Sequence, residues 1–181
     1  MNELFLTGDL HLNHRKIIKY SSRPFHCIED HDMSLIRNWN SVVGSGDTVI
    51  IDGDLSFGNV DLTKDYLSSL NGKKIMVLGD HDKQVWQCKS YFEKIVQMYQ
   101  FIYRGHWIAI CHWCMRVWPK SHYNSYHGYA HSHGALPPIG KSWDVGVDNN
   151  NYTPLHIHDF LKIMEVRPNN ENYLGDAICK K

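Results

Sequence analysis

The chain has 181 residues, 43% of them hydrophobic, which is typical of one globular domain with a sizeable core. Lys plus Arg and Asp plus Glu number 19 each, so the overall charge predicts no long-range attraction to nucleic acid or to an anionic membrane. We expect a cytoplasmic protein, because the sequence shows neither a basic leader with a long apolar run nor an apolar stretch of membrane-spanning length.

The use of cysteine and histidine narrows the chemistry. Five irregularly spaced cysteines argue against a disulfide framework and suit a reducing compartment. Thirteen histidines are many for this length, and they direct attention to metal ligands and proton carriers.

Three short apolar runs in the first half predict β-strands. They cover residues 3–7, 48–52 and 74–78, and each is followed by Gly-Asp. Glycine before an acidic residue would let the backbone turn sharply and bring the side chain close to a charged centre.

Helical patterns lie between these runs. Apolar residues at three- and four-residue steps, including Met33 and Trp39, predict a helix over residues 28–43, and a similar pattern from Leu62 to Leu70 predicts a second helix. This alternation of three strands with two helices predicts a parallel sheet with right-handed crossovers.

The second half has a different pattern, in which strands follow strands. Residues 95–103 and 107–111 are predicted strands around a turn, and residues 126–130 and 143–147 predict two more. Residues 156–166 form an amphipathic stretch typical of a helix. Together the patterns predict an α/β fold with two sheets.

Acidic residues and histidines gather where the predicted strands end, which is where open parallel sheets bind ligands. Asp9 and His11 are two residues apart in an extended segment, so both side chains can point to the same side. The acidic residues and histidines collected from these strand ends are Asp9, His11, Asp54, Asp80, His81, Asp82, His112, His131 and His133.

Carboxylates and imidazoles without thiolates suit divalent manganese, iron, zinc or nickel. About seven ligands from this collection would be too many for one ion. They predict two ions about 3.5–4 Å apart, bridged by one carboxylate and one hydroxide.

The order of these blocks resembles a known signature. Asp9-Leu10-His11, Gly53-Asp54, Gly79-Asp80-His81-Asp82, His112 and Ala130-His131-Ser132-His133 are similar to the D-x-H, G-D, G-N-H-D/E, H and G-H-x-H blocks of the calcineurin-like metallophosphoesterases. Stretches at 14–18, 71–74, 111–112 and 143–148 are similar to a small bacterial and phage branch of that superfamily.

The resemblance spans residues 5 to about 150, before a C-terminal helix and tail over 154–181. It implies one domain over 1–181, in which two mixed β-sheets pack as a sandwich with flanking helices, an α/β/β/α arrangement.

The resemblance also implies roles for the blocks. One metal is held by Asp9, His11 and His133, the other by Asp80, His112 and His131, and Asp54 bridges them. Two divalent cations, manganese first, would let a bridging hydroxide attack a phosphodiester or phosphomonoester. His81 is the candidate general acid, and the adjacent Asp82 would orient its ring and raise its pKa.

Two positions depart from the signature. Ala130 replaces a glycine, and we expect the added methyl group to be tolerated at an ordinary backbone angle. Asp80 replaces an asparagine, so a negative charge stands where an amide NH2 would donate to the phosphate. We expect Asp80 to strengthen metal binding and to weaken phosphate stabilisation, which reduces activity.

Other basic and aromatic residues are candidates for substrate contacts. The basic candidates are His14, Arg15, Arg23 and Arg116. For the first three, a solvated basic patch is the competing interpretation. Trp118 and Tyr126 lie between the last two metal blocks, where they would contact a nucleobase or aryl group or pack the second sheet.

The remaining cysteines and histidines are predicted to be structural. Cys111 and Cys114 lack the second pair that a structural zinc needs and are expected to be reduced thiols. His127 is a candidate for a group just outside the metal ligands. Surface positions are expected for His26, His31, His106, His156 and His158.

Three functions fit these patterns. The first is a phosphoesterase acting on a small or nucleotide-like ester. The second is a nuclease, which the neutral charge makes a weaker candidate. The third is a weakly active or inactive metal-binding scaffold, which Asp80 keeps open.

Overall fold

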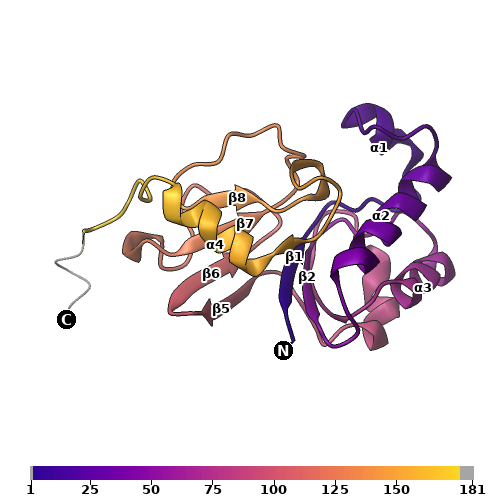
Figure 1. Ribbon diagram of the computed structural model, residues 1–181, viewed down its shortest axis with the longest axis horizontal. Coiled ribbons are helices and arrows are strands. Elements are labelled where there is room, and N and C mark those ends of the chain that lie inside the picture. The colour runs from indigo at the N-terminus through magenta and orange to yellow at the C-terminus, as the bar shows by residue number, and fades with distance from the viewer. Residues whose placement is uncertain (1, 176–181) are drawn as a thin grey trace.

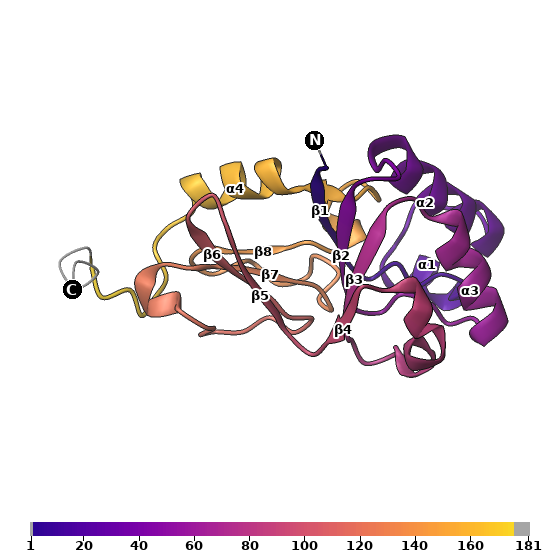
Figure 2. The ribbon, with the colours of Figure 1, turned by 90° about the horizontal axis from the view of Figure 1, so that it is seen from below.

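The computed structural model describes residues 2–175 and contains two β-sheets with helices outside them (Figures 1 and 2). The end of the predicted tail, with Cys179, lies outside the described residues. Within residues 2–175 no helix combines the length and apolarity that crossing a bilayer requires.

The first sheet has the strand order β4-β3-β2-β1-β9. Its strands are β1 (Leu4–Thr7), β2 (Thr48–Asp52), β3 (Lys73–Val77), β4 (Lys94–Val96) and β9 (Leu155–His156). The first four are parallel, and β9 runs antiparallel to β1. The sheet is therefore mixed, and its parallel strands end at one edge.

Helices α1 (Arg15–Tyr20), α2 (Ile28–Val42) and α3 (Val60–Ser69) lie on the side of this sheet that faces away from the second sheet (Figure 2). Helix α3 begins where the Asn59 side chain accepts a hydrogen bond of 2.9 Å from the Leu62 N–H. A 3₁₀ segment, η1 (Lys83–Tyr91), connects β3 to β4.

The second sheet has the order β5-β6-β7-β8 and is also mixed. Its strands are β5 (Tyr99–Tyr103), β6 (His106–Ile110), β7 (Tyr126–Tyr129) and β8 (Ser142–Asp144). Strands β5 and β6 are antiparallel, whereas β6, β7 and β8 are parallel. Helix α4 (Ile157–Val166) lies along this sheet, and two short 3₁₀ turns, η2 (Ser121–Tyr123) and η3 (Val147–Asn149), lie in its loops (Figure 1).

The two-sheet α/β prediction is confirmed, but one predicted strand was wrong. The run 95–103 forms two strands that belong to different sheets: Ile95 pairs with Met76 in the first, and Phe101 pairs with Ile108 in the second. The chain crosses between the sheets at residues 97–98. The run gives no clear local signal for such a crossing, because Gln97 and Gln100 stand singly among apolar residues and both halves are equally suited to a sheet.

Two hydrophobic clusters hold the layers together. One joins the first sheet to its helices through residues such as Trp39, Leu67 and Val49. The other joins the two sheets and α4 through residues such as Ile50 and Phe160. The edge where both sheets end is therefore supported from both sides.

Helix α2 presents a different face to the core than its pattern predicted. Met33, predicted to be part of the apolar face, is 64% exposed, whereas Leu35 and Trp39 are buried. The Trp39 indole N–H also donates to the carbonyl oxygen of Asn71 at 3.0 Å, so its polar atom is satisfied.

We therefore expect Trp39→Ala to lower the free energy of unfolding by about 3–5 kcal/mol, because it leaves a cavity and an unpaired carbonyl. Met33→Ala, on the same helix, should change it by about 0.5 kcal/mol or less. Urea denaturation followed by circular dichroism measures both. Equal effects in the two variants would contradict this assignment of the buried face.

His127, on β7, is buried inside the second sheet. Among the described residues, none of its hydrogen bonds joins it to a predicted metal ligand. Its Nδ1–H donates to the Ala109 carbonyl at 3.1 Å, and its Nε2 accepts from the Met115 N–H at 3.3 Å. Burial lowers the pKa of His127 to about 4, although hydrogen bonding to the backbone at Ala109 and Trp113 acts in the opposite direction. The ring is therefore neutral in the folded protein.

This low pKa predicts a loss of stability in acid. Between the unfolded value near 6.5 and the folded value near 4, the unfolded chain holds a proton at this position that the folded chain does not, so the free energy of unfolding falls as the pH falls. Metal-free wild type should lose up to about 3 kcal/mol more across this window than His127→Gln. Urea titrations at pH 7, 5.5 and 4 test this, and parallel profiles would contradict it.

Candidate metal centre

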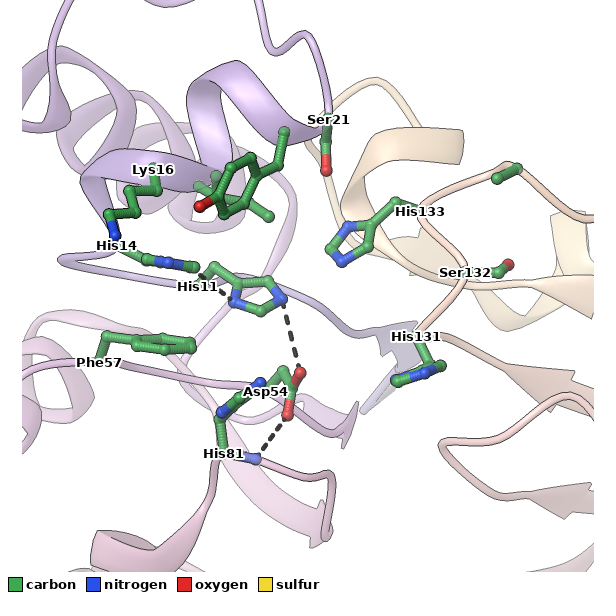
Figure 3. Close-up of a pocket in the computed structure, with 13 residues that line it drawn as sticks. His11, His14, Lys16, Ser21, Asp54, Phe57, His81, His131, Ser132 and His133 are labelled. Atoms are coloured by element: carbon green, nitrogen blue, oxygen red, sulfur yellow. Dashed lines mark hydrogen bonds and ion pairs between the residues drawn. The ribbon is translucent and has the colours of Figure 1, made fainter.

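The candidate ligands come directly after five strands, three in the first sheet and two in the second. Asp9 and His11 follow β1, Asp54 follows β2 and Asp80 follows β3, while His112 follows β6 and His131 and His133 follow β7. Figure 3 shows side chains from both sheets pointing toward one another across the shared edge.

Two groups of three side chains have ligand atoms within 4.8 Å of one another: Asp9, His11 and His133, and Asp54, His112 and His131. Asp54 lies between them, because its Oδ2 is 3.5 Å from Nε2 of His11 and 3.7 Å from Nε2 of His112. One carboxylate therefore faces both groups.

Several of these donor atoms are buried without a hydrogen-bond partner. They are both carboxylate oxygens of Asp9, Nε2 of His11 and Nε2 of His112. Burial, reinforced by the nearby carboxylates of Asp144 and Asp54, raises the pKa of Asp9 well above its usual range. Burial and the adjacent His133 lower the pKa of His11. A divalent cation would satisfy all of these atoms, and the donor set fits one.

The backbone at the ligands is strained. Asp9, His11, Asp54, His131 and His133 all have φ between 49° and 64°, in the left-handed region that side chains other than glycine rarely adopt. Such residues cost about 1–3 kcal/mol each and cluster at functional sites. Strain at five of seven predicted ligands favours a functional rather than a structural role for these turns.

The glycines before the acidic residues make room for ligands. A Cβ on Gly53 would lie 2.1 Å from Nδ1 of His112, and one on Gly79 would lie 2.5 Å from Oδ1 of Asp54. Gly53 has a φ of 79°, which fits its expected part in a sharp turn, whereas Gly8 and Gly79 lie outside the left-handed region, so at these two positions close approach rather than a turn explains the glycine. Ala130, as expected, is accommodated without a positive φ.

Hydrogen bonds to groups outside the candidate ligand set fix the orientation of two histidine rings. Nδ1 of His112 donates to the Asp52 carbonyl at 2.9 Å, and Nδ1 of His133 donates to Oδ2 of Asp148 at 2.7 Å. Since each Nδ1 then carries the proton, each Nε2 keeps the lone pair that a metal needs.

Arg23 is buried beneath the ligands and does not reach the cavity, contrary to its prediction as a substrate contact. Its guanidinium donates to both carboxylate oxygens of Asp148 at 2.7 and 2.8 Å and to the carbonyls of Asp9 and Leu10. It also contacts Nε2 of His31 at 2.7 Å. Its side chain is sequestered because a bidentate carboxylate and two carbonyls satisfy its buried donors.

The buried arginine explains a second correction. His31, predicted at the surface, is fully buried and links Arg23 to Oδ1 of Asp32, which its Nδ1 contacts at 2.7 Å. A chain of polar groups runs from His133 into the interior, through Asp148, Arg23 and His31. Burial acts to raise the pKa of Asp148, but the hydrogen bonds that His133 and Arg23 donate to its carboxylate outweigh burial and lower it.

Asp82 differs from its predicted role. Instead of orienting the His81 ring, its carboxylate accepts hydrogen bonds from the backbone N–H groups of Asp54, Leu55 and Gly79 at 2.7 to 3.0 Å. Burial raises its pKa, although these three bonds act in the opposite direction. Asp82 therefore holds together the turns after β2 and β3, one of which carries Asp54.

A cavity of about 620 Å³ opens over the ligands. His14 and His81 line it, as predicted for groups near the substrate. Arg15 lines a different hollow beside α1, and Arg116 is exposed and paired with Glu171 at 2.9 Å, so neither faces this cavity. Both long side chains point into solvent, a direction that sequence spacing does not reveal.

Asp80 is half exposed, and its Oδ2 lies 3.4 Å from Nδ1 of His131. It is outside the two tight groups of donors. A negative charge therefore stands beside the cavity at the position where the signature has an amide.

Residues that sequence reasoning assigned no role complete the site. Asp144 accepts hydrogen bonds from Ser132 and from the Gly134 and Gly146 N–H groups, and so holds the loop that carries His131 and His133. Asp144 and Asp148 lie in the stretch 143–148, whose resemblance to the phage branch was the available signal. Phe57 stacks on His14. Its position shortly after the turn that carries Asp54 was the only sign of this in the sequence.

Two aromatic residues between the last two blocks pack the second sheet. Trp118 and Tyr126 are buried, and the Trp118 indole N–H donates to the Ser125 carbonyl. Cys111 and Cys114 are free thiols, as expected. These findings confirm the structural interpretation of this segment.

A third group, Glu3, His156 and His158, lies at the start of α4. Nε2 of His156 contacts Glu3 at 3.2 Å, and Nε2 of His158 contacts the Tyr103 hydroxyl at 2.9 Å. Unlike the atoms of the central groups, these nitrogens have partners, so we assign this group a structural role.

Comparisons with known proteins agree with the fold. No protein-family model matches the chain. The uncharacterized protein MJ1445 of Methanocaldococcus jannaschii is 31% identical over 178 residues, covering 91% of this chain and 93% of that protein. The Gene 66 protein of Mycobacterium phage L5 is 36% identical over 88 residues, 45% of this chain and 41% of that protein. A protein of unknown function from Aquifex aeolicus, AQ665, has a similar fold, with a TM-score of 0.74, 20% identity and coverage of 90% of this chain and 100% of that one.

The link from Arg23 through Asp148 to His133 predicts an indirect effect on metal binding. Asp148→Asn should weaken binding of manganese about tenfold to hundredfold, because the His133 ring loses the carboxylate that orients it. Asp159→Asn, an exposed aspartate on α4, is the matched control and should bind as wild type does. Isothermal titration of metal-stripped protein measures both, and unchanged affinity in Asp148→Asn would contradict the role assigned to this link.

Proposed function

This chain belongs to the same family as the Methanocaldococcus jannaschii protein MJ1445, and we propose that it is a metal-dependent phosphoesterase of the calcineurin-like superfamily. The observation that carries the proposal is the position of Asp54, whose Oδ2 lies between Nε2 of His11 and Nε2 of His112. A carboxylate shared by two groups of donors, among which Asp9, His11 and His112 have buried atoms without partners, is typical of a dinuclear site.

In this proposal the two groups of donors hold two divalent cations. Asp9, His11 and His133 hold one, and His112 and His131 hold the other together with Asp80, which lies outside the tight group but beside His131; Asp54 bridges the two cations. Manganese is the first candidate, and iron, zinc and nickel suit the same donors. When bound, the cations supply Lewis acidity to the phosphate oxygens and lower the pKa of a water molecule that hydrolyses the ester.

The protein's own groups position the ester and the proton. His81 lines the cavity, and its backbone N–H donates to Oδ1 of Asp54 at 3.0 Å, which fixes it beside the bridging carboxylate. We assign it the proton that the leaving oxygen takes up. Asp82 keeps this geometry through the backbone amides that it binds.

Asp80 favours a second candidate, a scaffold that binds metal but hydrolyses esters slowly. It is half exposed and lies 3.4 Å from His131, which lines the cavity, so from there its charge would repel an anionic ester and it offers no donor. The free thiols among the described residues suit action in the cytoplasm. Neutral overall charge supports a small ester over a polynucleotide as substrate.

The test is hydrolysis of bis-p-nitrophenyl phosphate and p-nitrophenyl phosphate by metal-stripped protein to which manganese is returned. We expect turnover that requires the metal, and an increase of up to about 100-fold in kcat in Asp80→Asn, which restores a donor at the phosphate. Asp54→Asn should abolish turnover. The ratio of the two substrates distinguishes a diesterase from a monoesterase.

Asp61→Asn, on the exposed face of α3, is the control for removing a carboxylate and should act as wild type does. Metal binding without turnover in both wild type and Asp80→Asn would favour the scaffold. Absence of metal binding altogether would refute the proposal.

A further inference from the structure

One wall of the cavity over the candidate ligands is aromatic. Tyr20, the last residue of α1, and Phe57, in the loop after β2, both line it and are 68% and 36% exposed. Large rings that remain exposed inside a cavity, rather than singly on the surface, mark a binding surface.

The rings on this wall form a continuous row. His14 stacks on Phe57 with centroids 3.8 Å apart and planes at 12°, and Tyr20 meets His14 edge-on at 6.3 Å. At the other end, His81 lies 4.6 Å from Phe57 (Figure 3). Because His14 already covers one face of Phe57, Tyr20 is the most exposed ring of the row and the one free to stack on a ligand.

The size and charge of the cavity agree with an organic phosphate. Its volume of about 620 Å³ lies in the range of cavities that enclose small organic ligands and far exceeds the needs of a phosphate group alone. Among the described residues that line it, Asp54 is the single carboxylate, and Lys16 adds a positive charge near the row of rings. The site therefore suits an anionic ester that carries an uncharged flat group.

We infer that this cavity selects phosphate esters that carry a planar aromatic group, a nucleobase or an aryl ring, which stacks on Tyr20 while the phosphate lies at the candidate metal centre. The inference rests on the proposed function for the position of the phosphate. It replaces the predicted contacts at Trp118 and Tyr126, which are buried in the second sheet.

Binding of matched ligands to manganese-loaded protein tests the inference by isothermal titration. Adenosine 5′-monophosphate and ribose 5-phosphate share the sugar and the phosphate and differ in the base, and phenyl phosphate separates an aryl preference from a nucleobase preference. Adenosine, titrated into metal-free protein, probes the aromatic wall without the phosphate.

We expect the monophosphate to bind about tenfold more tightly than ribose 5-phosphate, the gain expected from one stacking contact. Tyr20→Ala should abolish this preference and leave the affinity for ribose 5-phosphate unchanged, which also shows that the variant is folded. Tyr20→Phe should keep the preference. Tyr123→Ala, which removes an exposed tyrosine on η2, is the matched control and should keep it as well.

Equal affinities for the two ligands in wild type, or a preference that survives Tyr20→Ala, would overturn the inference. Its failure is distinct from failure of the proposed function. Metal-dependent hydrolysis of the p-nitrophenyl esters without a base preference refutes the inference alone. The opposite outcome is a protein that hydrolyses neither ester but prefers the base through Tyr20 and binds adenosine weakly without metal. That outcome supports the inference and refutes the esterase.

Discussion

The Asp9 carboxylate and the facing nitrogens of His11 and His112 are buried together without hydrogen bonds, and the surrounding structure is arranged around this cluster. Burying an unpaired carboxylate costs several kcal/mol, which is a large part of the 5–15 kcal/mol that typically separates folded from unfolded protein. Five residues in left-handed conformation add to the cost. Two hydrophobic clusters, one on each side of the first sheet, offset it. Without a cation this cluster destabilises the fold. A bound cation would instead make the cluster stabilise the contact between the two sheets.

Two buried aspartates hold this cluster in place from outside. Asp148 orients His133 and is itself neutralised by Arg23, while Asp82 uses backbone amides to join the turns after β2 and β3. Neither needs to contact a substrate. Their contribution is geometric, because a ligand ring with a fixed proton and a turn with fixed amides lose less entropy when a cation binds.

Sequence reasoning succeeded where the signal was local. Apolar runs located β1, β2, β3, β6, β7 and β8 but not the two-residue β9, and Asp and His directly after strands located the two groups of donors. It failed where the outcome depends on contacts between distant residues. Arg23 read as a surface cation because nothing near it in sequence shows that Asp148 would neutralise it, and His31 followed the same error. Met33 matched a helical period but lies at the edge of the buried face. The crossing at residues 97–98 was missed because it changes the sheet without changing the composition.

The donors of the centre are spread widely along the chain, since the first group needs Asp9 and His11 from the beginning and His133, held by Asp148, from near the end. During synthesis the early carboxylate remains hydrated until the ribosome has released almost the whole described chain. Long-range closure of this kind slows folding, because loop entropy is lost before the contacts form. Capture of the proposed metal ions would consequently come late in synthesis, and a truncated product ending before residue 133 would carry the N-terminal candidate ligands without the third donor of their group.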